Sequence, residues 1–226
     1  MQSIAQLQQQ DGRLLISYEG LSISARELWE GTGTTPLCFA RNLAAILAAP
    51  QLSRQPLRFI VGIRRQSSWL ASRYAQSAKK YPEFSPADFE SRVEGFHALS
   101  QGPAAQWLHY NQVYQSLSAT FPSAQLLFLP LEALSHNPAG YIQRVTSWLE
   151  CPSADAPVDD APPCDMAGLR NGLSTEANVW VLPNGNGRIH LSPAMGDRID
   201  SCYSSSNRAF AQLTGLPLAD LGYHVG

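Results

Sequence analysis

An arginine and a serine eight residues apart form the pair in this sequence best suited to hold a phosphate group. Arg64 directly follows a short apolar run, and Ser72 lies in the stretch of helical spacing that comes next. A guanidinium donates paired hydrogen bonds to phosphate oxygens, and a hydroxyl early in a helix can donate from the other side. The spacing indicates one anion site shared by both side chains. The alternative is a solvated arginine and a serine without a role, since many strand ends carry charge.

A strand, a tight turn and a helix would position this pair. Residues 57–63 are apolar and rich in β-branched side chains, which is typical of a strand buried on both faces in a parallel sheet. Ser67 or Ser68 is expected to be the N-cap of the helix that follows. In open α/β sheets, ligands bind outside the carboxyl ends of strands, and the first helical turn offers unpaired N–H groups to an anion. Arg64 would therefore stand where an anionic ligand binds.

Two further stretches, 14–18 and 125–129, have the composition of strands. Helical segments connect the three strands, so the sheet should be parallel. The alternation around the Asn-Gly pairs of residues 179–191 predicts a β-hairpin.

Helix starts are marked by pairs of a capping residue and a proline, and Gly215 is expected to end the last helix. The pairs are Thr35 with Pro36, Ser85 with Pro86, Asn137 with Pro138, and Ser192 with Pro193. Residues 107–121 are expected to form one helix. The helix after Asn137 should bury one apolar face, made by Tyr141, Ile142, Val145, Trp148 and Leu149.

Composition indicates a single domain. The chain has 226 residues, 44% of them hydrophobic, and a formal charge of −2, which gives no reason to expect a nucleic-acid surface. No apolar run is long enough to cross a bilayer, so we expect no membrane partner and a cytoplasmic location. Residues 151–166, with four prolines, are expected to be a mobile loop. The cysteines have no metal-ligand spacing, so we expect no metal and free thiols at Cys38, Cys151, Cys164 and Cys202.

The segment IRRQSSWLASRY, residues 63–74, resembles the 3′-phosphate-binding segment of sulfotransferases that use 3′-phosphoadenosine 5′-phosphosulfate (PAPS). Residues 14–22, 127–150 and 206–223 resemble other segments of bacterial members of that family, in the same order. The resemblance implies an α/β fold, a P-loop-like three-layer sandwich with a mostly parallel sheet, a small C-terminal β-hairpin and a closing helix. It also implies transfer of a sulfuryl group from PAPS to a hydroxyl or amine of a small-molecule or glycan acceptor.

The resemblance also assigns roles to residues. Arg64 and Ser72 would hold the 3′-phosphate of PAPS. Residues 169–174, LRNGLS, are similar to a loop that covers this phosphate, with Arg170 and Gly172 matching and an asparagine replacing the usual lysine. Glu19, just past the strand at 14–18, would be the general base. The alternative for Glu19 is a carboxylate exposed to solvent in a turn, and the alternative for residues 169–174 is a turn with one exposed arginine.

The segment GTGTT, residues 31–35, is similar to the loop that holds the 5′-phosphosulfate, but no strand pattern precedes it and it lacks the lysine. We therefore interpret it as a loop that leads into a helix. The sequence begins after the point where the phosphosulfate loop is expected. It is therefore either an enzyme whose first strand lies upstream or a degenerate, non-catalytic relative; a P-loop kinase is a weaker alternative.

An absent first strand would leave an open sheet edge, which invites pairing with another chain. We therefore expect the 226-residue chain alone either to self-associate as a homo-oligomer or to be poorly soluble, and to make little sulfated product. Size-exclusion chromatography and a turnover assay, with and without the upstream segment, measure this. A monodisperse monomer with full turnover would contradict it and would direct attention to residues 31–35.

Overall fold

A computed structural model of the chain describes residues 25–48, 57–149, 174–176 and 178–226. Several features expected from the sequence lie outside these ranges. They are the strand at 14–18, Glu19, the loop at 151–166, Arg170 and Gly172.

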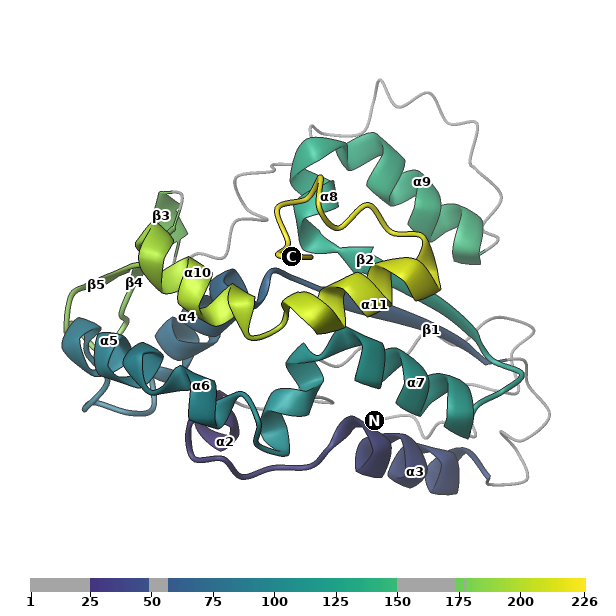
Figure 1. Ribbon diagram of the computed structural model, residues 1–226, viewed down its shortest axis with the longest axis horizontal. Helices are drawn as coiled ribbons and strands as arrows, with labels where there is room; N and C mark the ends of the chain where they lie inside the picture. The colour runs from purple at the N-terminus through teal and green to yellow at the C-terminus, as the bar shows by residue number, and fades with distance from the viewer. Residues whose placement is uncertain (1–24, 49–56, 150–173, 177) are drawn as a thin grey trace, which may run out of the picture.

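Helices predominate in the first two thirds of the chain, where β1 and β2 each lie between helical segments (Figure 1). The strands are β1 (Arg58–Ile63), β2 (Gln125–Pro130), β3 (Ser174–Glu176), β4 (Val179–Val181) and β5 (Arg188–His190). The helices before β2 are α2 (Ala25–Trp29), α3 (Pro36–Leu47), α4 (Gln66–Ser77), α5 (Pro86–Glu94), α6 (Phe96–Leu99), the 3₁₀ helix η2 (Ala104–Leu108) and α7 (Tyr110–Thr120). Those after β2 are α8 (Leu131–His136), α9 (Pro138–Leu149), α10 (Pro193–Ser201) and α11 (Ser204–Thr214).

β1 and β2 pair in parallel, from Arg58 opposite Gln125 to Ile63 opposite Pro130. The parallel pairing of these two strands is confirmed, and both carboxyl ends lie at the same edge. β1 is less buried than predicted, because Ile60 is 37% exposed. The described residues thus contain a small parallel sheet in a mixed helix and strand fold, while the three-layer arrangement stays a prediction.

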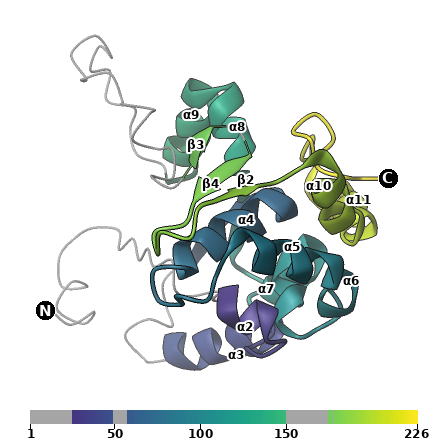
Figure 2. The ribbon, with the colours of Figure 1, turned by 90° about the vertical axis from the view of Figure 1, so that its left-hand side faces the viewer.

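Helices cover this sheet from two sides. α8 and α9 lie on one side of the parallel strands and α3 lies on the other, as the two perpendicular views show (Figures 1 and 2). α7 packs against both α3 and α11. An aromatic cluster joins these layers at Phe210, whose fully buried ring contacts Tyr110, Tyr114 and Phe128.

A second hydrophobic core lies under the hairpin. β4 and β5 pair in antiparallel register, which confirms the predicted hairpin, and β3 adds a third strand. Two side-chain amides of its turn, from Asn184 and Asn186, each donate a hydrogen bond of 2.8 Å to the carbonyl oxygen of Phe84. The hairpin is therefore fastened to the loop between α4 and α5.

Three of the predicted caps are confirmed directly. Thr35, Ser85 and Ser192 each accept a hydrogen bond from the amide three residues later, and each is followed by a proline. The interpretation of residues 31–35 as a loop leading into a helix is thereby confirmed. At the fourth position, the Asn137 side chain accepts from the Gly140 amide at 2.9 Å.

Two helices are broken where the sequence predicts continuity. The last helix is divided into α10 and α11 at Cys202 and Tyr203, because α10 packs on α4 whereas α11 packs on α7. Gly215 ends α11 with a φ of 70°, as predicted. The segment 107–121 is divided at His109, whose backbone (φ −86°, ψ 83°) is not helical.

The prediction that α9 buries an apolar face is wrong. None of its residues is buried, and Ile142 is 54% exposed. The physical reason is a groove beneath the helix. A cavity of about 410 Å³ separates it from β2 and is lined by Leu127, Gln143, Arg144, Ser147 and Trp148.

Phe210→Ala should lower the free energy of unfolding by about 3 to 5 kcal/mol, because it leaves a cavity in the aromatic cluster. Leu213→Ala, on the same helix but 48% exposed, is the matched control and should cost about 1 kcal/mol or less. Urea denaturation followed by circular dichroism measures both. Equal losses in free energy of unfolding would show that the aromatic cluster around Phe210 does not stabilise the fold more than an exposed contact does.

Candidate functional site

The turn from Arg64 to Ser67 lies at the carboxyl end of β1 and leads directly into α4. Helix α4 begins at Gln66, and Arg65 takes the N-cap position without a side-chain cap. The prediction that Ser67 or Ser68 is the N-cap is therefore wrong. Both serines are buried inside the first helical turn.

A carboxylate from a distant helix caps α4 instead. Asp200, at the end of α10, accepts hydrogen bonds from the Ser67 amide at 2.8 Å and from the Ser67 hydroxyl at 2.7 Å. The Ser67 hydroxyl is thus a donor to Asp200 and does not cap its own helix. A negative charge at this place also interacts favourably with the amino end of the helix dipole.

A second carboxylate holds the residue before the helix. Glu132, in the first turn of α8, accepts a hydrogen bond from the Arg65 amide at 2.9 Å. Its other oxygen accepts from the Tyr223 hydroxyl at 2.7 Å. The Arg65 Nε lies 3.8 Å from Glu132 Oε1, which is an ion-pair distance and too long for a hydrogen bond.

Buried polar side chains hold the two remaining residues of the turn. Gln66 is fully buried and donates to Leu108 O at 3.0 Å and to Asn207 Oδ1 at 2.8 Å. The Tyr110 hydroxyl donates to the carbonyl oxygen of Arg64. Every residue from Arg64 to Ser67 is therefore fixed by a side chain from elsewhere in the chain.

These contacts change what the amino end of α4 can bind. The sequence predicts that N–H groups in this turn are unpaired and available to an anion. The amides of Arg65 and Ser67 are instead occupied by Glu132 and Asp200. An anion bound here therefore cannot use these two amides, and it depends on side chains and on the other amides of the first helical turn.

The Arg64 guanidinium is the side chain suited to that task. It is half-buried, and within the described ranges no hydrogen bond or ion pair reaches it. Burial lowers the pKa of this guanidinium, while the nearby Glu132 carboxylate raises it. A partly desolvated cation without a partner is costly, and a bound anion would offset that cost.

Ser72 lies in the second turn of α4 and is 5% exposed. The structure brings Arg64 and Ser72 into one strand, turn and helix, but no described cavity has both among its lining residues. That they face one phosphate stays a prediction. Glu19, Arg170 and Gly172 lie outside the described residues.

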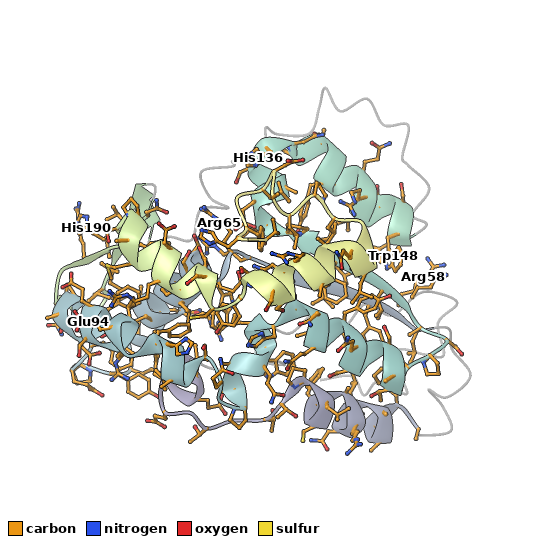
Figure 3. The ribbon with its side chains drawn as sticks, in the orientation of Figure 1. Arg58, Arg65, Glu94, His136, Trp148 and His190 are labelled. Atoms are coloured by element: carbon orange, nitrogen blue, oxygen red, sulfur yellow. The ribbon has the colours of Figure 1, made fainter. Side chains whose placement is uncertain are left out.

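Two described cavities lie toward the other end of the sheet. Figure 3 shows Arg58 and Trp148 side by side at the start of β1, far along the strand from Arg65. The groove beneath α9 and a neighbouring cavity of about 230 Å³ share Leu127 and Arg144. Because ligands of open α/β sheets bind at the carboxyl ends of the strands, we do not assign the anion site to these cavities.

Comparison with known families decides the class of protein. The model of the sulfotransferase domain matches residues 36–162, which is more than half of the chain. The chain belongs to the sulfotransferase family. Searches of curated proteins and of solved structures gave no match. The match includes β1, α4 and β2, so the turn at Arg64 lies within the sulfotransferase domain.

The residues that fix this turn in the sulfotransferase carry weak sequence signals. Glu132 and Tyr223 lie inside segments that resemble the family, but nothing in their spacing connects them. Asp200 has no signal at all, since it lies 133 residues from Ser67. A buried polar triplet such as Gln66, Ser67 and Ser68 at a helix start is the one available clue that distant partners are needed.

In the described ranges, no group of three or more His, Cys, Asp or Glu side chains is placed to hold a metal ion. No helix among the described residues is long and apolar enough to cross a bilayer.

Asp200 should make stability depend on pH. Burial raises the pKa of its carboxyl above the ordinary value of 3.8, while the hydrogen bonds from Ser67 lower it. A raised pKa means that the folded state binds more protons than the unfolded state between these two values. The free energy of unfolding of the wild type, relative to Asp200→Asn, should therefore rise as pH falls from 7 toward 4.

Urea denaturation at intervals across this pH range measures the difference, and groups that titrate in both proteins cancel. Asp200→Ala removes the two oxygens that accept from the Ser67 amide and hydroxyl. It should lower the free energy of unfolding by roughly 1 to 3 kcal/mol at pH 7. If the difference in free energy of unfolding between the wild type and Asp200→Asn stays constant, or falls as pH falls, Asp200 does not have a raised pKa in the folded state.

Proposed function

We propose that this sulfotransferase transfers a sulfuryl group from PAPS to a hydroxyl or amine of a small-molecule or glycan acceptor. The observation that carries the proposal is the half-buried Arg64 guanidinium, without a partner among the described residues, at the carboxyl end of a parallel strand. Its fit to an anion supports a nucleotide phosphate there. In the complete fold, β1 and β2 would belong to a P-loop-like three-layer sandwich.

Each candidate residue has a stated task in this proposal. Arg64 binds the 3′-phosphate of the donor from the strand end, and Ser72 donates to the same phosphate from α4. Arg170 and Gly172 cover that phosphate. Glu19 takes the proton of the acceptor hydroxyl or amine as the new bond to sulfur forms.

PAPS supplies the sulfuryl group, whose bond to the phosphate oxygen breaks as its bond to the acceptor forms, leaving adenosine 3′,5′-bisphosphate. The contribution of the described chain to this step is geometric. Glu132 and Asp200 hold the backbone of the turn at Arg65 and Ser67 before any ligand binds, so that little backbone freedom remains to be lost there.

A second candidate function is a non-catalytic domain that keeps the sulfotransferase scaffold. The observation that favours it is the pair of carboxylates at the amino end of α4, because negative charges beside an anion site weaken binding. Measured turnover separates the two functions. Binding of adenosine 3′,5′-bisphosphate without sulfation of any acceptor would support the scaffold.

Arg64→Ala should weaken the binding of adenosine 3′,5′-bisphosphate by about 1.5 to 3 kcal/mol, the range of hydrogen bonds to charged groups. Isothermal titration calorimetry measures the dissociation constant, Kd, which should rise roughly ten- to a hundredfold. Arg41→Ala, which removes an exposed arginine from α3, is the matched control and should bind as the wild type does.

Binding by the wild type that Arg64→Ala leaves unchanged would remove Arg64 from the site. An absence of binding by the wild type would contradict the proposal that this protein binds the nucleotide. A loss of equal size in Arg41→Ala would indicate a general effect of charge instead of a local contact.

A further inference from the structure

The break between η2 and α7 contacts the turn at two points. The carbonyl oxygen of Leu108, the last residue of η2, accepts the hydrogen bond from Gln66 Nε2 at 3.0 Å. Tyr110, the first residue of α7, reaches Arg64 with its hydroxyl. A helix that continued through His109 would pair the Leu108 carbonyl with a helical amide. The break therefore leaves one helix end and one helix start available to the turn.

The contact with Arg64 involves both polar groups of its backbone. The Tyr110 hydroxyl accepts a hydrogen bond from the Arg64 amide at 3.4 Å and donates one to the Arg64 carbonyl oxygen. In the described part of the chain, no other hydrogen bond reaches either group. Arg64 lies after the last residue of β1, Ile63, and before the first residue of α4, Gln66, so neither element pairs these groups. They depend on the tyrosine instead.

The Tyr110 side chain is itself held in place. It is 4% exposed, and its ring contacts those of Phe210 and Tyr223, with centroids 5.9 and 6.5 Å away. Burial raises the pKa of the Tyr110 hydroxyl, so the group stays protonated and can donate. The amide and the carbonyl belong to the two peptide planes on either side of the Arg64 Cα. Holding both planes fixes φ and ψ, and with them the direction of the Cα–Cβ bond.

We propose that Tyr110 is a positioning residue for nucleotide binding: by holding both backbone groups of Arg64, its hydroxyl sets the direction in which the Arg64 side chain leaves the end of β1. Tyr110 acts through Arg64 and touches no substrate. The part of this inference that concerns nucleotide affinity rests on the proposed function. The part that concerns the backbone of Arg64 does not.

Tyr110→Phe is the direct test, because it removes the hydroxyl and keeps the buried ring. Without the hydroxyl, the backbone of Arg64 gains freedom that binding must remove, and the Kd for adenosine 3′,5′-bisphosphate should rise about three- to tenfold. Tyr114→Phe is the matched control. Tyr114 lies one turn further along α7, its ring also contacts Phe210, and its hydroxyl has no hydrogen-bond partner among the described residues. This variant should bind as the wild type does.

A double-mutant cycle separates positioning from a general loss of structure. In the Arg64→Ala background there is no guanidinium to direct, so adding Tyr110→Phe should leave the Kd unchanged. Three results would overturn the proposal: an equal loss of affinity in both backgrounds, no loss from Tyr110→Phe alone, or a Tyr110→Phe variant that does not fold. Thermal unfolding of all variants accompanies the titrations.

A second measurement does not depend on the nucleotide. Hydrogen–deuterium exchange of the Arg64 amide, followed by nitrogen-15 NMR, reports whether this amide has an acceptor. Tyr110→Phe should speed the exchange roughly fivefold or more, whereas the Leu70 amide, inside α4, should exchange as in the wild type.

Unchanged exchange of the Arg64 amide, or an equal increase at Leu70, would overturn the inference. Faster exchange at Arg64 alone, in a protein that binds no nucleotide, would leave the positioning of the Arg64 backbone standing and contradict only the proposed function.

Discussion

The polar groups of the turn between β1 and α4 must find partners, and this requirement organises the fold around residues 64–67. The chain leaves the sheet at Arg64 and enters α4 at Gln66, and the amides of Arg65 and Ser67 in this turn are partly or fully buried. An unpaired buried amide costs roughly 1 to 3 kcal/mol. Two carboxylates meet this need and bind the turn to α8 and α10.

The same contacts explain the arrangement of the C-terminal third. α10 supplies Asp200 and α11 supplies Asn207 to the turn, and the tail supplies Tyr223 to Glu132, which in turn holds the Arg65 amide. The break between α10 and α11 is what allows one helix to reach α4 and the other to reach α7. The C-terminal segments therefore both close the core and hold the candidate phosphate site.

The local parts of this site could be predicted from the sequence, and the long-range parts could not. β1, its turn and α4 follow from an apolar run, a charged break and helical spacing, and the cap and proline pairs locate the other helices. The N-cap at Ser67 was a reasonable prediction that failed, because the true partner, Asp200, is 133 residues away. The buried face predicted for α9 failed because amphipathic spacing shows which face is apolar and not whether anything packs against it. Ser72 and the residues outside the described ranges remain predictions.

A crystal structure of the protein with adenosine 3′,5′-bisphosphate tests the central claim most directly. The 3′-phosphate should lie within hydrogen-bond distance of the Arg64 guanidinium, while Asp200 stays on the Ser67 amide and Glu132 on the Arg65 amide. A phosphate bound in the groove beneath α9, or one that displaces Asp200 to take the amide of Ser67, would contradict the claim that a pre-formed turn presents the Arg64 guanidinium to the nucleotide.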